Sequence, residues 1–312
     1  MRAGDLRHPV VVGLNGAEPN TALTYATREA ARHGCGLRLV HAYPDSVPLV
    51  SMPPLLPDEA LRYGADRVVS QAIHQLDRLR DGDLPIDLVV RDGSAVQVLL
   101  EAAEEAHAIV LDRHESYWPD GLTAAGRCLP VAAHARCPVI SVPADWDPDA
   151  VHGRVVVGVD GSRASREALG GAFHAASVRR AGLVVIHAWQ PPEICFGDPR
   201  ELDDTSKAWE MSAQTHVAEA LAGWRKLFPE VSVEVRLTPG HPARVLAEAT
   251  ESADLLVVGR HGGALGHDFP IGSVARALVT GGRCPVEVTP PRAVDSAEDF
   301  GAARNGQAAP VH

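Results

Sequence analysis

Residues 154–161 read RVVVGVDG, and residues 9–16 read PVVVGLNG. A run of valines that ends in glycine and a polar turn is typical of a buried parallel strand at the start of a βα unit. The repetition continues along the chain, since LVHAY at 39–43 matches VIHAW at 185–189, and RCPV at 136–139 recurs at 283–286. The offset between the copies is 145 to 147 residues. A repeat of this length indicates a duplicated domain rather than a solenoid.

Each copy alternates short valine-rich runs with amphipathic stretches, which is the pattern of an α/β domain with a parallel sheet. In the second half, this pattern predicts strands at 154–160, 183–189, 231–236, 254–259 and 285–289, and helices at 163–180, 201–227, 242–252 and 272–281. We therefore expect two tandem Rossmann-like domains, at 1–147 and 148–292. Each would hold a five-stranded parallel sheet with helices on both faces. Residues 293–312 contain few apolar side chains and are predicted to be a disordered tail.

The composition of the 312-residue chain limits its function. Apolar residues make up 46% of it and aromatic residues 4%, so its core must be built from Val, Leu and Ala. A net charge of −11 argues against nucleic acid or an anionic membrane as a partner. No apolar leader or membrane-length run is visible, which predicts a cytoplasmic protein. The five scattered cysteines form no CxxC pair and are expected to be core residues.

A glycine-rich stretch, GRHGGALGHDFPIGS at 259–273, follows the predicted fourth strand of the second half. A strand, a glycine-rich loop and a helix start in this order gather backbone amides around phosphate. Gly259 and Gly262 would let the main chain approach a ligand and adopt positive φ. Gly272, Ser273 and Val274 would offer free first-turn amides. The switch point of a doubly wound sheet would bring this loop beside the end of the first strand.

These residues resemble the universal stress protein family. Its nucleotide-binding members share the pattern G-x2-G-x9-G-[S/T], which this loop meets in full, together with VVGVDGS at 156–162 and CPV at 284–286. The resemblance covers nearly the whole chain apart from the tail. It implies two HUP-type domains with strand order 3-2-1-4-5, and ATP, possibly with Mg²⁺, along the carboxyl edge. It also implies intramolecular pairing of the two domains through strands at 139–142 and 286–289, and leaves a homodimer open.

Carried over by position, the resemblance implies that Val159 and Asp160 meet the adenine and ribose end of ATP and that Ala188 lines the base pocket. It implies that Val258 and Gly259 flank the ribose. The residues implied to hold the phosphates are Gly262, Gly272, Ser273 and Val274. Asp160 can accept hydrogen bonds from an amine or a ribose hydroxyl but would repel phosphate, which agrees with the nucleoside end. The alternatives are a turn carboxylate or helix N-cap at Asp160, a plain N-cap at Ser273, and an ordinary connecting loop.

The first half lacks the pattern. Asp112, Glu115, Ala125 and Gly126 stand at the positions of the three glycines and the serine, and Asn15 replaces Asp160. Placing carboxylates next to phosphate in a crevice with little water would cost on the order of several kcal/mol, because like charges repel each other there. We therefore expect a degenerate N-terminal domain with a structural role. A cation site made by Asp112, His114 and Glu115 is the alternative.

Catalytic machinery is not apparent in the sequence. The P-loop pattern is absent, and the two lysines, Lys207 and Lys226, lie far from the loop. Arg260 or Arg276 would have to supply positive charge, although both are expected to face solvent. The histidines near the loop (His241, His261 and His267) lack zinc spacing, and Asp268 would reach Mg²⁺ only through water.

These observations favour an ATP binder that uses the nucleotide as a regulatory or slowly hydrolysed ligand. Two other classes of function stay open. One is an ATP-dependent phosphotransferase that draws on the loops at 44–57 and 190–205, and the other is a nucleotide-free scaffold.

Overall fold

The computed structural model describes residues 5–16, 20–43, 58–79, 84–113, 124–189, 199–261 and 270–291. The chain divides into two compact units, Met1–Asp149 and Ala150–His312, which are described separately below. The predicted tail at 293–312 lies outside the described residues.

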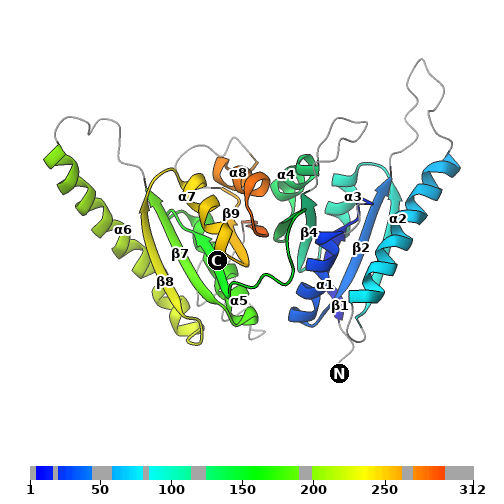
Figure 1. Cartoon of the computed structure of the whole chain (residues 1–312), viewed down its shortest axis with the longest axis horizontal. Helices are drawn as coiled ribbons and strands as arrows, with labels where there is room; N and C mark the ends of the chain where they lie inside the picture. The colour runs from blue at the N-terminus through cyan, green and yellow to red at the C-terminus, as the bar shows by residue number, and fades with distance from the viewer. Residues whose placement is uncertain are drawn as a thin grey trace, which may run out of the picture. The chain divides into compact units, whose positions relative to one another are not determined.

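The N-terminal unit is a parallel sheet in the order β3-β2-β1-β4-β5. Its helices α1 and α2 cover one face, and α3 and α4 cover the other (Figure 1). In chain order, the elements are β1 (Asp5–Gly13), α1 (Thr21–His33), β2 (Cys35–Tyr43), α2 (Asp58–Leu79), β3 (Ile86–Asp92), α3 (Ala95–Ala102), β4 (Ala108–Arg113), α4 (Ala124–His134) and β5 (Val139–Pro143).

The C-terminal unit repeats this architecture, with parallel strands in the order β8-β7-β6-β9-β10. Helices α5 and α6 pack on one face, and α7 and α8 on the other. Its elements are β6 (Arg154–Gly158), α5 (Arg163–Arg179), β7 (Gly182–Trp189), α6 (Pro199–Leu227), β8 (Val233–Pro239), α7 (Pro242–Ala249), a 3₁₀ turn (Thr250–Ser252), β9 (Leu255–Gly259), α8 (Ser273–Gly281) and β10 (Val286–Thr289).

Both units confirm the predicted fold class, and numbering the strands within each unit gives the expected order 3-2-1-4-5. The largest deviation is the third strand of the second unit, which runs over Val233–Pro239 instead of 231–236. Val231 stays in the connection because its amide donates to the Phe228 carbonyl at 3.1 Å, which closes a turn. The predicted helix at 242–252 ends as a 3₁₀ turn, a common way for the last turn of a helix to tighten.

The core of the C-terminal unit is mainly aliphatic, as the composition predicts. Val155 and Val157 of β6 and Val185 of β7 are fully buried. An aromatic group is added between α5 and α6, where Phe173 stacks with Trp224 and Phe228 at centroid separations of 6.1 and 5.8 Å. The three aromatic rings therefore pack the C-terminal end of α6 against α5.

Polar caps determine where α5 begins. The Ser162 hydroxyl accepts from the Ser165 amide at 3.2 Å and is the N-cap of the helix. The Asp160 carboxylate in turn accepts from the Ser162 amide at 2.9 Å. Side-chain oxygens of this kind satisfy amides that have no partner at a helix start. They hold the loop between β6 and α5 in one conformation.

Four cysteines are described, and none of them forms a disulfide. Cys128, Cys137 and Cys284 are buried and Cys35 is partly exposed, whereas Cys195 lies outside the described residues. In the part of the chain that the structure describes, no helix has both the length and the apolar character of a membrane span.

Candidate functional site

The carboxyl ends of β6 and β9 lie side by side in the C-terminal unit. The register pairs Val155 with Leu255 and Val157 with Val257, so the residues that follow each strand emerge next to one another. Because β7 pairs with the opposite edge of β6, the chain connections diverge here. This is the switch point at which a doubly wound sheet opens a crevice.

A cavity of about 260 Å³ occupies this crevice, on the face of the sheet that carries α7 and α8. Its lining includes eight of the nine residues predicted from the sequence: Val159, Asp160, Ala188, Val258, Gly259, Gly272, Ser273 and Val274. The ninth, Gly262, lies outside the described residues, as do His267 and Asp268. The structure therefore brings together predicted residues from four separate elements or their connections.

The start of α8 forms one wall of the cavity. Gly272 is the N-cap, and Ser273 is the first residue of the helix, so Ser273 is not itself the N-cap. The expectation of a free amide at Gly272 is wrong, because this amide donates to the Arg260 carbonyl at 2.8 Å. First-turn amides have no intrahelical acceptor, so the anion-attracting groups of this wall are those of Ser273, Val274 and Ala275.

Of the two roles predicted for Gly259, the positive φ is wrong, and the close approach to a ligand stays a prediction. Its φ is not in the left-handed region. A Cβ at this position would lie 2.6 Å from the carbonyl oxygen of Ala164 in α5, far inside van der Waals contact. Gly259 therefore allows β9 and α5 to approach each other, and this packing places the end of β9 at the cavity.

The loop after β6 is held from two sides. The Asp160 carboxylate is the turn carboxylate described above, so the structural alternative for this residue is present, and its exposed side chain also lines the cavity. From β7, the Nδ1 nitrogen of His187 donates to the Val159 carbonyl at 2.9 Å. The N-terminal unit repeats this contact between His41 and Leu14 at 3.0 Å.

Arg260 supplies a cation that was expected to face solvent. It is only 8% exposed and lines the cavity, whereas Arg276 is exposed on α8. A positive charge close to this cavity would favour an anionic ligand. His261 lines the same cavity.

Sequence reasoning missed the apolar wall made by Pro242 and Leu246 of α7. The sequence predicted a helix over 242–252, but a helical pattern does not show which cavity its apolar side chains line. A Cβ on Gly158 would lie 2.7 Å from Leu246 Cδ1, so this glycine allows α7 to pack close to β6.

The equivalent crevice of the N-terminal unit is nearly closed. Its volume is about 30 Å³, and Asn15 and Asp112 lie in its lining. Asn15 Nδ2 donates to Asp112 Oδ1 at 2.9 Å, so the residues at the positions of Asp160 and Gly259 bond to each other. Asp112 is 5% exposed. His114 and Glu115 lie outside the described residues, and the described residues contain no group of three potential metal ligands.

Comparison with known proteins agrees with this duplicated architecture. A model of the universal stress protein family matches residues 7–143 and 152–290. The chain belongs to the universal stress protein family.

Its relatives have the same tandem length. A universal stress protein of Mycolicibacterium smegmatis is 30% identical over 304 residues, which cover 91% of this chain and 97% of the relative. One from Mycobacterium tuberculosis strain H37Rv is 30% identical over 304 residues, covering 92% and 98%. Among solved structures, a universal stress protein of Archaeoglobus fulgidus matches with a TM-score of 0.65 at 16% identity, covering 92% and 98%, and this likeness concerns the fold.

Proposed function

We propose that this universal stress protein binds ATP in the cavity of its C-terminal unit and uses it as a regulatory or slowly hydrolysed ligand. The observation that carries the proposal is the contrast between the two copies of one fold. The C-terminal crevice is open at about 260 Å³, and the N-terminal crevice is closed by the Asn15–Asp112 hydrogen bond at about 30 Å³. The family pattern for phosphate binding is complete only in the open copy.

The lining of the cavity is chemically divided in a way that suits a nucleotide. Ile186, Ala188, Pro242 and Leu246 offer apolar surface for a base. Asp160 offers a carboxylate acceptor for an amine or ribose hydroxyl. The first-turn amides of α8 and the Arg260 guanidinium favour the anionic phosphates. A dianionic or trianionic tail next to Asp160 would be repelled, so the phosphates belong at the α8 end.

A binding role is favoured over phosphoryl transfer by what the described lining contains. Within the described residues, Asp160 is the one carboxylate in the cavity, and its Oδ1 accepts from the Ser162 amide. Phosphoryl transfer requires clamped metal ions, an aligned acceptor and a residue that orients it. The contacts support retention of ATP and provide little for its rapid turnover.

Isothermal titration of ATP into the full chain tests the proposal. We expect saturable binding and, with labelled ATP, stoichiometric retention with little turnover. Fast turnover or transfer of label to a second substrate would instead indicate the phosphotransferase. Absence of heat, together with absence of ATP or AMP from denatured purified protein, would indicate the nucleotide-free scaffold.

Ser273→Ala gives a sharper test of the phosphate end. If the hydroxyl meets a phosphate oxygen, its loss should weaken ATP binding by about 1–2 kcal/mol, which lies between the usual contributions of neutral and charge-assisted hydrogen bonds. Thr280→Ala on the same helix is the matched control, because Thr280 donates to the Arg276 and Ala277 carbonyls at 3.1 Å and does not line the cavity. Equal affinities for both variants would place the phosphates elsewhere.

For the N-terminal unit we propose a structural role, with β5 and β10, the last strands of the two units, pairing inside one chain. The support is the resemblance to the family and the closed N-terminal crevice. Hydrogen exchange tests the pairing, because the outward amides of an unpaired edge strand exchange quickly. Protection of both strands in a monomeric sample is the expected result. Sedimentation of the full chain shows whether two chains also associate.

A further inference from the structure

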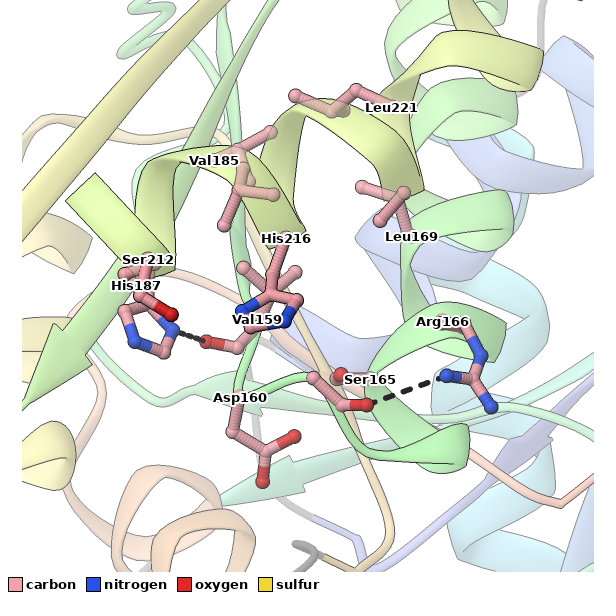
Figure 2. Close-up of a pocket in the computed structure, with 14 residues that line it drawn as sticks. Val159, Asp160, Ser165, Arg166, Leu169, Val185, His187, Ser212, His216 and Leu221 are labelled. Atoms are coloured by element: carbon pink, nitrogen blue, oxygen red, sulfur yellow. Dashed lines mark hydrogen bonds between the residues drawn. The ribbon is translucent and has the colours of Figure 1, made fainter. Parts of the chain in front are cut away.

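A second cavity, of about 280 Å³, lies in the C-terminal unit between the sheet, α5 and α6 (Figure 2). Leu169 of α5, Val185 of β7 and Leu221 of α6 line it and are each no more than 1% exposed. Val217 and Ala220 extend the apolar surface along α6. The volume of this space, which is lined in part by buried aliphatic side chains, lies close to the lower end of small-molecule pockets, roughly 300 Å³.

This cavity lies on the opposite face of the sheet from the proposed ATP site. Successive strand residues point to opposite faces. Val185 and His187 of β7 accordingly line the second cavity, whereas Ile186 and Ala188 line the first. The two cavities share Val159, Asp160 and Ser165, at the loop after β6 and the first turn of α5. They therefore meet at one loop but have different walls.

The corresponding space in the N-terminal unit is filled by side chains of α2. A Cβ on Gly16, the counterpart of Gly161, would lie 3.0 Å from Val68 Cγ2, whereas no atom of the described residues lies within 4 Å of the same point on Gly161. Gln75 also reaches the start of α1, where its amide bonds to the backbone of Asn20 at 2.9 and 3.1 Å. At these described positions, α2 therefore approaches the loop after β1 more closely than α6 approaches the loop after β6.

The polar lining of the second cavity comes from Asp160, Ser165, Arg166, His187, Ser212 and His216. His216 of α6 and Ser165 of α5 lie on the same side as Asp160 and Arg166 (Figure 2). The Asp160 carboxylate and the Arg166 guanidinium have opposite charges, so together they add no net charge to this end of the cavity. His187 Nδ1 donates to the Val159 carbonyl, so in the neutral form of the ring Nε2 is the nitrogen that can accept from a ligand N–H or O–H.

We propose that this cavity, between α5 and α6, binds an uncharged, ring-sized apolar molecule that carries one hydrogen-bond donor. The apolar body occupies the space among Leu169, Val185 and Leu221, and the donor faces His187 and His216. A charged ligand is disfavoured because the aliphatic walls offer no partner for a buried charge. The proposal does not depend on ATP binding, because Leu169, Val185 and Leu221 line this cavity and not the first, although the two cavities share Val159, Asp160 and Ser165.

Indole, which has an apolar double ring and one N–H, is the probe for a direct test. Equilibrium dialysis of indole against the full chain should give saturable binding of one equivalent. Ala220→Leu adds bulk to the cavity wall and should weaken binding about tenfold or more, a loss equivalent to roughly 1.4 kcal/mol. Ala218→Leu is the matched control, since Ala218 is exposed on the same helix and should leave the affinity unchanged within about twofold.

Two results would overturn the proposal: binding to the wild type that does not saturate, and equal affinities for the two leucine variants. Circular dichroism establishes that each variant is folded. A crystal of the wild type soaked with 5-bromoindole gives an independent readout that needs no variant. The bromine signal should lie between α5 and α6, and a signal in the ATP cavity or on the surface alone would refute the assignment. Loss of ATP binding would leave these outcomes unaffected.

Discussion

At the scale of single residues, Gly259 shows how packing imposes a residue type on a functional loop. The Ala164 carbonyl oxygen lies 2.6 Å from the point that a Cβ would occupy. Gly259→Ala should therefore lower the free energy of unfolding of the C-terminal unit by about 1–3 kcal/mol, the usual cost of overpacking. Gly281→Ala is the control, since nothing lies within 4 Å of that position at the end of α8. Urea unfolding measures both, and equal stabilities would contradict the contact.

Cys128 provides a second prediction at this scale. Burial of this side chain, which is 0% exposed, raises the pKa of the Cys128 thiol to about 12. The thiolate is the reactive form, so at neutral pH Cys128 should resist alkylation. Iodoacetamide labelling followed by peptide mass spectrometry should detect modification of Cys128 only in denaturant. Rapid labelling of this cysteine in the native protein would show that α4 opens.

At the scale of elements, His41 ties β2 to the end of β1 through its hydrogen bond to the Leu14 carbonyl. Burial lowers its pKa below the ordinary value of 6.5, and the nearby Arg127 adds to this effect while the hydrogen bond opposes it. A histidine with a depressed folded-state pKa contributes stability that is present above the unfolded-state pKa. That contribution is lost as the pH falls through 6.5 toward the folded-state pKa.

His41→Gln tests this pH dependence. Glutamine retains an N–H donor but does not titrate. The wild type should therefore lose stability relative to the variant as the pH falls below about 6.5, the unfolded-state value. Urea unfolding at a series of pH values measures the free energy of unfolding of both proteins. Subtracting one from the other removes the contribution of the other histidines, which both proteins share. A difference that stays constant with pH would show that His41 titrates alike in the folded and unfolded states.

At the scale of the whole molecule, the two units are one fold with two different crevices. The predicted stoichiometry is therefore one ATP per chain, because the Asn15–Asp112 hydrogen bond and the buried carboxylate close the N-terminal crevice. Mass spectrometry under native conditions counts bound nucleotides directly. Two ATP molecules per chain would show that the N-terminal crevice opens, and would contradict a purely structural role for that unit.

The sequence by itself determined the duplication, the α/β class and, in the second half, the element bounds to within three residues, because valine runs and helical periodicity act over a few neighbouring positions. It also identified eight residues that the structure gathers at one cavity. Gly262 and the rest of its loop lie outside the described residues, so their role stays a prediction.

Only the tertiary structure decided which groups face each other. It showed that Gly259 makes room for α5, that the Gly272 amide is already bonded, and that Arg260 is buried at the cavity. It also showed the space between α5 and α6, which depends on side chains of two helices separated by a strand. These features arise from contacts between elements that are distant in the chain, and local sequence patterns do not show such contacts.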